Sequence, residues 1–173
     1  LLSSYMDEIE TELFRLSRPY DEVIKRISRI AGFTERSALF VISEIGADMG
    51  VFESDKHLCS WAGLTPANNE SANKKKSTRC SKAGQYLKPL LIQCALAAVK
   101  SRKNPYYAIK YNRLAKRRGR KKAIIAIARM MLTSIYHMIL NNEEWKPDDY
   151  EAIIHPSKPE KVALTLVPRR AGS

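Results

Sequence analysis

The chain has 173 residues, of which 45% are hydrophobic and 8% aromatic, a size that suits one modest core, with or without appendages, rather than a two-domain enzyme. Its formal net charge of +12 and its isoelectric point near 9.7 indicate an anionic partner. Its three cysteines and three histidines lack the spacing of a metal site or of a disulfide framework. The sequence also shows no leader and no apolar run of membrane length, so we expect a cytoplasmic protein without a membrane partner.

An apolar seam with the spacing of a heptad repeat opens the chain. Its positions are separated by 4, 3, 4 and 3 residues, and acidic residues lie off the seam. The seam positions are Leu2, Met6, Ile9, Leu13 and Leu16. Two heptads fit either an ordinary amphipathic helix or the end of a coiled-coil arm over residues 1–18, which Pro19 stops. Because the chain starts inside this pattern and without Met, we expect it to be part of a longer protein.

Two helices joined by a short turn are predicted next. An apolar stripe from Val23 to Ile30 is followed by Gly32, and then by Thr34 as the N-cap of a helix that ends at Gly46. This is the layout of a helix-hairpin-helix, in which hairpin amides and a helix N-terminus bind a DNA phosphate, so Gly32 and Thr34 are candidate binding residues. Thr34 stands where such hairpins usually carry a second glycine, and simple helix packing is the alternative.

A short helix capped by Ser54 or Asp55 is expected to place Trp61 in the core and to end at Gly63. Residues 64–81 show no periodicity and predict an exposed loop, the kind of segment in which functional residues concentrate.

Three more helices are predicted after this loop. The first begins near Gly84, the second begins at Asn104 and Pro105, and the third follows the basic run 116–122 and holds a helical period to Asn142. Several prolines after Trp145 predict an extended or disordered tail over residues 143–173. The sequence therefore predicts a mainly α fold, with a helix-hairpin-helix domain over residues 20–142 between a coiled-coil-like helix and this tail.

Positive charge is concentrated in the middle of the chain. Residues 71–142 contain 18 Lys and Arg and no Asp or Glu, whereas residues 1–70 hold 7 basic and 12 acidic residues, and residues 143–173 hold 5 and 6. Solvated surfaces usually intersperse both signs, so this segregation favours a face that binds a polyanion, although a solvated helix junction is the alternative for the run 116–122.

Seven short segments in a fixed order resemble the C-terminal transposase domain shared by bridge-RNA-guided recombinases and pilin-gene invertases, over roughly residues 23–140. The segments are Ile30-Ala31-Gly32-Phe33, Ser43-Glu44-Ile45-Gly46, Phe52-Glu53-Ser54, Trp61-Ala62-Gly63-Leu64-Thr65-Pro66, Glu70-Ser71, Ser81-Lys82-Ala83-Gly84 and Ala126-Ile127-Ala128-Arg129. None of them is specific alone. In combination they identify a serine-bearing domain of an insertion-sequence transposase.

The resemblance implies that Ser71 is the nucleophile that attacks the DNA backbone. A serine ester of the phosphate preserves the energy of the broken bond, so rejoining requires no nucleotide cofactor. Ala72 stands where relatives often have glycine, and Ser77 and Ser81 are rival nucleophiles. The expected nucleic-acid-binding residues, besides Gly32 and Thr34, are Lys74, Lys75, Lys76, Arg79, Lys82, Lys88, Lys116, Arg117, Arg118, Arg120, Lys121 and Lys122.

The resemblance also implies a RuvC-like N-terminal half that is absent from this chain and holds a divalent metal such as Mg²⁺. We therefore expect no cofactor in this chain, and little or no catalysis by the chain alone. The expected partners are DNA, a structured guide RNA, and further copies of the full-length protein in a dimer or tetramer, within a bacterial or archaeal nucleoid. A non-catalytic helix-hairpin-helix module that binds DNA or RNA is the alternative, and an assembly domain that dimerises through the heptad seam is a third possibility.

Overall fold

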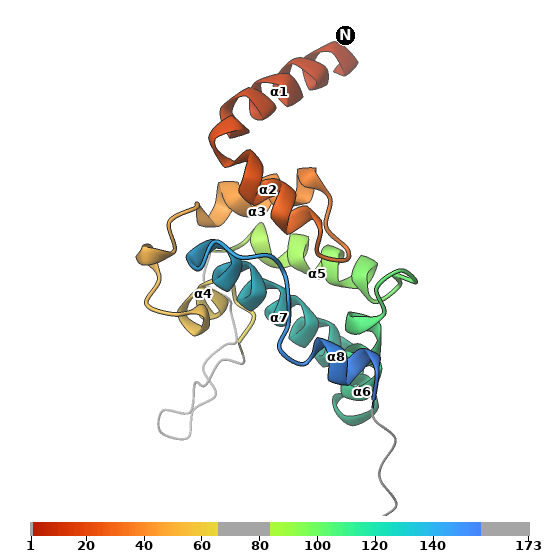
Figure 1. Cartoon of the computed structure of the whole chain (residues 1–173). Coiled ribbons are helices and arrows are strands. Elements are labelled where there is room, and N and C mark those ends of the chain that lie inside the picture. The colour runs from red at the N-terminus through yellow and green to blue at the C-terminus, as the bar shows by residue number, and fades with distance from the viewer. Residues whose placement is uncertain (1, 66–83, 157–173) are drawn as a thin grey trace, which may run out of the picture.

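A computed structural model describes residues 2–65 and 84–156, and these residues form a mainly helical fold in which the described ranges contain no strand (Figure 1). The elements, in chain order, are α1 (Leu2–Ser17), η1 (Arg18–Tyr20), α2 (Asp21–Ser28), α3 (Glu35–Ile45), η2 (Met49–Val51), α4 (Asp55–Trp61), α5 (Leu87–Ala98), α6 (Tyr106–Arg118), α7 (Arg120–Leu140) and α8 (Tyr150–Ile154). The prediction of a mainly α fold is confirmed.

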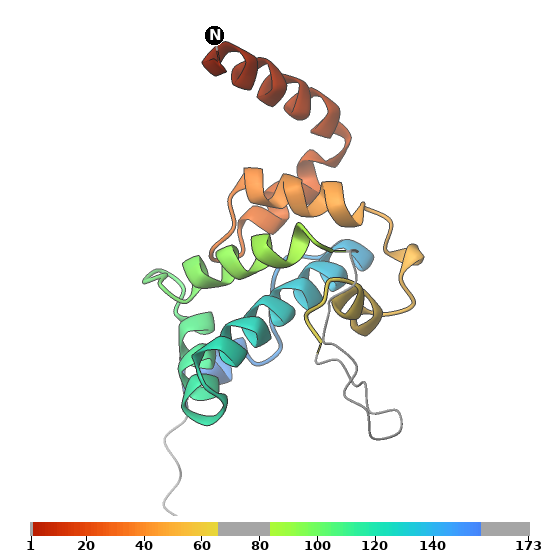
Figure 2. The same ribbon diagram turned by 180° about the vertical axis from the view of Figure 1, so that it is seen from behind.

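Helix α7 is the centre of the molecule, and α4, α5 and α6 all pack against it (Figures 1 and 2). The helical period predicts an apolar face of Ile124, Ile127, Met131 and Ile135, of which the last three are 0% exposed and Ile124 is partly buried. Leu87, Leu91 and Ala95 of α5 are also 0% exposed and belong to the same core. Burying such side chains removes apolar surface from water, so α7 is the element on which the stability of the domain depends most.

The hairpin of α2 and α3 packs above α5, on the side away from α4 and α6 (Figure 2). Thr34 caps α3 as expected, since its side chain accepts a hydrogen bond from the Ser37 amide at 3.2 Å while the Ser37 hydroxyl accepts one from the Thr34 amide at 2.8 Å. Gly46 ends this helix with a φ of +73°, which favours glycine. Ser54 rather than Asp55 caps α4.

The start of α6 differs by one residue from the sequence prediction. We expected Asn104 as N-cap and Pro105 as the first helical residue, but Pro105 occupies the cap position and α6 begins at Tyr106. The Asn104 side chain still accepts a hydrogen bond from the Tyr106 amide, at 3.3 Å, so the interaction that favours Asn before a helix is kept.

Residues 143–156 are not the extended tail that the sequence predicted, because this part of the chain returns to α6 and forms α8. Trp145 and Tyr150 pack against the rings of Tyr106 and Tyr107. The Tyr106 hydroxyl donates a hydrogen bond of 2.6 Å to Asp149. Aromatic burial therefore outweighs the prolines that suggested disorder. Residues 157–173 lie outside the described ranges.

An ion pair also joins α6 to the residues that precede α8. The Lys110 ammonium lies 2.6 Å from the second carboxylate oxygen of Asp149. Partial burial raises the pKa of Asp149, but the hydrogen bonds from Lys110 and Tyr106 outweigh this effect and hold the pKa below its usual value.

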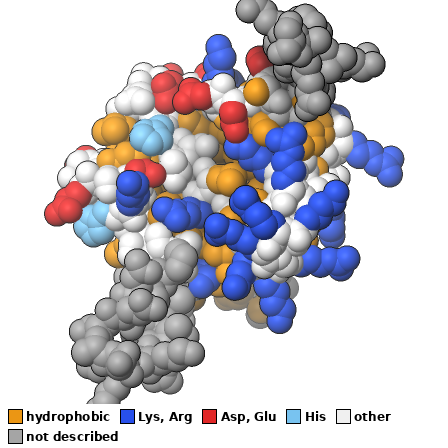
Figure 3. Space-filling view, turned by 90° about the horizontal axis from the view of Figure 1, so that it is seen from below, with side chains coloured by type: hydrophobic (Ala, Val, Ile, Leu, Met, Phe, Trp, Pro, Cys, Tyr) orange, Lys and Arg blue, Asp and Glu red, His pale blue; other side chains and the backbone are white. Residues whose placement is uncertain are grey.

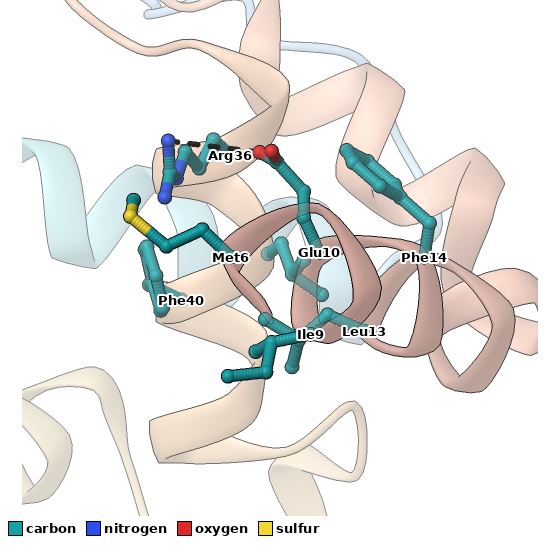
Figure 4. A pocket seen from close by; sticks show the side chains of 8 residues that line it. Met6, Ile9, Glu10, Leu13, Phe14, Arg36 and Phe40 are labelled. Atoms are coloured by element: carbon teal, nitrogen blue, oxygen red, sulfur yellow. Dashed lines mark ion pairs between the residues drawn. The ribbon is translucent and has the colours of Figure 1, made fainter. Parts of the chain in front are cut away.

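Helix α1 projects away from the rest of the domain (Figure 1). Its seam is largely exposed, with Leu2 82%, Met6 61% and Ile9 62% accessible. A shallow apolar pocket lies between α1 and α3, and Arg36 lies 3.6 Å from Glu10 beside it (Figure 4). An exposed seam on a projecting helix is typical of a surface that packs against another helix.

By length and composition alone, α7 could cross a lipid bilayer, although the apolar runs in the sequence looked too short for this. In the structure it is a core helix in contact with α4, α5 and α6, which accounts for its apolar composition.

We predict that Ile127→Asp unfolds the domain, because an unpaired carboxylate in this core costs several kcal/mol, which is roughly the whole stability of a small domain. Leu140→Asp is the matched control, because Leu140 lies on the same helix but is 53% exposed. Circular dichroism during thermal unfolding should show a cooperative transition for the control and none for Ile127→Asp. A folded Ile127→Asp protein with an unchanged melting temperature would contradict this packing.

Candidate nucleic-acid interface

A groove with a volume of about 710 Å³ crosses the lower side of the molecule, where α5, α6 and α7 meet the chain that follows α4. We call it the basic groove. Its lining residues are Gly63, Leu64, Thr65, Lys88, Leu114, Arg117, Arg118, Lys122, Ala123, Ile125, Ala126 and Arg129. The floor is apolar, and the charged members of this set are all basic. Figure 3 views the molecule from below, and Lys and Arg side chains gather there around hydrophobic ones, while most Asp and Glu lie toward the upper and left margins.

The corner between α6 and α7 supplies most of this charge. Gly119 forms the corner with a φ of +82°, and a Cβ atom there would have open space, so its conformation and not crowding requires glycine. The last turn of α6 is basic, which suits the negative end of a helix dipole. The first turn of α7 is also basic, and no acidic residue or capping side chain accompanies it. Cations at this positive end oppose the dipole of α7, so they do not serve the stability of the helix.

Most of the groove cations have no acidic partner within the described ranges. Among the described residues, ion pairs join Arg26 and Arg29 to Glu144, and Lys110 to Asp149. Within the same ranges, none of the groove residues Arg117, Arg118, Lys122 and Arg129 forms an ion pair. A concentration of cations without partners attracts an anionic ligand.

Four of the predicted binding residues line the basic groove, namely Lys88, Arg117, Arg118 and Lys122. Three others, Lys116, Arg120 and Lys121, are exposed at the same corner but do not line it. Arg129 is not among the predicted binding residues, although its spacing of 7 from Lys122 places both on one face of a helix with Ile125 and Ala126 between them. The helical period of this segment could therefore have indicated Arg129 as a binding residue.

Gly32 and Thr34 have structural roles in this fold. Gly32 has a φ of +89°, and a Cβ atom there would lie 2.1 Å from the carbonyl oxygen of Cys94 in α5. The glycine is therefore required by close packing of the α2–α3 hairpin on α5, which was the alternative to phosphate binding. Thr34 is occupied in the cap of α3. We do not include these two residues in the interface that we propose.

Ser71 lies outside the described residues, as do its rivals Ser77 and Ser81. The predicted binding residues Lys74, Lys75, Lys76, Arg79 and Lys82 also lie outside them.

The two described ends of the chain on either side of residues 66–83 lie close together. Thr65 lines the basic groove, and a Cβ atom on Gly84 would lie 2.7 Å from the Cα atom of Ala62, three residues before Thr65. The segment that contains Ser71 therefore starts at the groove and ends near its own starting point.

Cys59 is buried under the groove, next to α7. Burial raises the pKa of its thiol, although a hydrogen bond with Thr133 and the charge of Arg129 act in the opposite direction. A thiol with a raised pKa is a poor nucleophile. Among the residues that the structure describes, no three His, Cys, Asp or Glu side chains are grouped closely enough to hold a metal ion.

Comparison with protein families gives the decisive observation. The model of the Transposase IS116/IS110/IS902 family matches residues 24–113, just over half of the chain. The chain belongs to this family. Comparisons with curated proteins and with solved structures found no match.

Membership of the transposase family implies a transposase-type function on DNA. The match runs from α2 through most of α6 and includes Thr65, Lys88 and the segment with Ser71. Arg117, Arg118 and all of α7 lie beyond it, so this part of the basic groove is known only from the structure.

We predict that the chain binds duplex DNA with a log–log salt slope of roughly −5 to −7, as expected for about five to eight phosphate contacts. Replacing both Arg117 and Arg118 by Gln should make the slope less steep by about 2, because each phosphate contact releases counterions. Arg102→Gln with Arg113→Gln is the matched control, since both arginines are exposed and neither lines the groove. Fluorescence anisotropy at several salt concentrations measures the slopes, and equal slopes for the two double variants would exclude the groove as the binding face.

Proposed function

We propose that this chain is the DNA-binding, serine-nucleophile part of a transposase, in which the basic groove holds the DNA backbone and Ser71 attacks a phosphodiester beside it. One observation carries the proposal: the acid-free groove opens at Thr65, where the segment containing Ser71 begins. Membership of the family implies DNA as the partner, and the basic groove is a surface whose charge suits DNA.

Chain length supports this arrangement. Ser71 follows Thr65 by six residues, and an extended chain spans at most about 3.6 Å per residue, so Ser71 can reach no further than roughly 22 Å from Thr65. Along the helix axis, α7 rises about 10 Å from Lys122 to Arg129. A nucleophile on this segment is thus within covalent reach of a strand in the groove. Ser77 and Ser81 precede Gly84 by seven and three residues, which span at most about 25 Å and about 11 Å, so tether length does not exclude them and the family resemblance is what favours Ser71.

The proposed step is a transesterification. The Ser71 hydroxyl oxygen bonds to phosphorus, the bond from phosphorus to one sugar oxygen breaks, and that sugar oxygen leaves with a proton as a strand end. A sugar hydroxyl from another strand then attacks the phosphoserine and releases Ser71, so bonds balance without an external energy source. Arginine and lysine side chains in the groove stabilise the extra negative charge at phosphorus.

This reaction requires a base that the groove does not provide. The lining of the groove, as described, contains neither a carboxylate nor a histidine, so the proton acceptor must come from elsewhere. We propose that it belongs to a RuvC-like half of the intact transposase with a bound divalent metal, directed by a guide RNA. This chain alone would then bind DNA and leave it uncut.

In the full-length transposase, with its guide and metal, we predict that Ser71→Ala abolishes strand exchange and the covalent protein–DNA adduct. The substitution removes one hydroxyl group, so the affinity for DNA should change less than about twofold, because the nucleophile acts only in bond making. Denaturing gel electrophoresis detects the adduct, and Ser77→Ala and Ser81→Ala are the matched controls. An adduct that survives Ser71→Ala but disappears in one of the controls would assign the nucleophile to that serine.

A non-catalytic module that binds DNA or structured RNA is the competing function. The groove contacts phosphates, which both nucleic acids share, so binding alone does not separate the two functions. Strand exchange with all three serines replaced would reject the serine mechanism and leave the binding module.

The exposed seam of α1 favours a further role in assembly with a second copy of the chain. Ile9 and Leu13 lie on this seam, and together with Phe40 of α3 they line the apolar pocket in Figure 4. A paired seam would remove these side chains from water, as in a coiled coil.

We predict that Ile9→Asp with Leu13→Asp converts oligomers of this chain into monomers, because two buried carboxylates would oppose pairing of the seam. Thr11→Asp is the control, since Thr11 is exposed and lies off the seam. Light scattering coupled to size-exclusion chromatography measures the mass. A monomeric parent chain, or an Ile9→Asp/Leu13→Asp variant that stays oligomeric, would contradict assembly through α1.

A further inference from the structure

Arg129 occupies an unusual position among the cations of the basic groove. Arg117, Arg118 and Lys122 are exposed at the corner, whereas Arg129 lies two turns further along α7 and is half-buried. Its helix contacts α4 at this point, and the Cys59 thiol lies 3.9 Å from the Arg129 carbonyl oxygen. Arg129 therefore marks the inner end of the groove, on the side of Leu64 and Thr65.

The guanidinium of Arg129 interacts with the neutral Cys59 thiol but forms no ion pair within the described parts of the chain. Asp55 is the acidic residue that faces α7 from α4, and it accepts a hydrogen bond of 3.2 Å from Thr133, one turn beyond Arg129. The Asp55 carboxylate is thus hydrogen-bonded to a neutral hydroxyl group and forms no ion pair with Arg129. A partly desolvated arginine without a counterion is costly, and an anion in the groove would remove this cost.

The surroundings of Arg129 define the class of anion. Ile125 and Ala126, which precede it on α7, line the groove with it, and so does Thr65, which carries a hydroxyl group. A planar guanidinium donates two parallel hydrogen bonds to the two free oxygens of a phosphodiester, which a lysine ammonium does not. The rise of about 10 Å from Lys122 to Arg129 equals about three phosphate-to-phosphate steps along the axis of one strand.

We infer that Arg129 binds the phosphodiester at the inner end of the groove, and that it positions this phosphate beside Leu64 and Thr65. The inference rests on the proposed function, because it assumes that the groove holds a DNA strand. It adds a single phosphate contact to that proposal and assigns it to a residue beyond the region that the family model matches. Arg129 is a positioning residue for the strand, while the nucleophile lies elsewhere in the chain.

A methylphosphonate scan of a short DNA duplex tests this contact directly. Each duplex carries one neutral methylphosphonate in place of a phosphate, and its affinity for the chain is measured by fluorescence anisotropy. The parent chain should lose affinity at several positions of the scan, about tenfold at the one that Arg129 contacts, and Arg129→Gln should lose about tenfold on unmodified DNA. At that one position Arg129→Gln should lose nothing further, because the two changes remove the same contact.

Two variants serve as controls. Arg113→Gln removes the same charge from an exposed site outside the groove and should keep the sensitivity to that methylphosphonate. Arg129→Lys should keep the salt slope of the parent chain but lose about fivefold in affinity, since a point charge replaces two parallel hydrogen bonds. A purely structural role would lower the melting temperature of Arg129→Gln without changing the pattern of the scan.

The outcomes separate the inference from the proposed function. If Arg129→Gln still loses affinity at every position where the parent chain does, Arg129 does not contact a phosphate, although the groove still binds DNA. If the parent chain shows no sensitivity at any position and no salt dependence, the proposed function itself fails.

Discussion

The structure depends on the two faces of α7. One face carries Ile127, Met131 and Ile135 into the centre of the core, and the other carries Lys122 and Arg129 along the wall of the basic groove. Because both faces belong to one rigid helix of 21 residues, the positions of the groove cations are fixed by the packing of the core. Sites built on helices are held more precisely than sites built on loops. The fold therefore provides a rigid surface for DNA beside the segment to which we assign the nucleophile.

Charge separation in the sequence becomes a separation in space. The acid-free middle of the chain forms α5, α6 and α7 and supplies all five cations of the groove, whereas Glu144 and Asp149 pair with Arg26, Arg29 and Lys110 elsewhere. Ion pairs of this kind fasten the C-terminal part of the chain to α2 and α6. Among the described residues, these carboxylates pair away from the groove and none of them lines it. One set of charges thus stabilises the fold, while Arg117, Arg118, Lys122 and Arg129, which form no ion pair within the described ranges, are available to phosphates.

Periodicity and capping residues were sufficient to predict much of the helical fold. The helical period of α7 and the cap at Thr34 are confirmed, because they depend on local rules of spacing and backbone conformation. The C-terminal part was predicted wrongly, since the contact of Trp145 and Tyr150 with α6 joins residues about 40 positions apart and leaves no local signal. The same limit explains why the role of Gly32 required the structure, which shows it against Cys94. For the site, the sequence indicated the basic corner but not that Arg129 and Thr65 complete a groove with it.

Site-directed crosslinking tests the central claim, that the basic groove faces the DNA backbone, most directly. Thr65→Cys places a thiol in the groove, and Leu96→Cys places one on an exposed part of α5 outside it, in a chain with Cys80 replaced by Ser. Cys59 and Cys94 are buried, so the introduced thiol should react preferentially with a DNA duplex that carries a disulfide tether on a backbone phosphate. The account predicts a covalent complex with Thr65→Cys that excess unmodified DNA suppresses, and none with Leu96→Cys. A complex formed equally well by both variants, or only by Leu96→Cys, would contradict it.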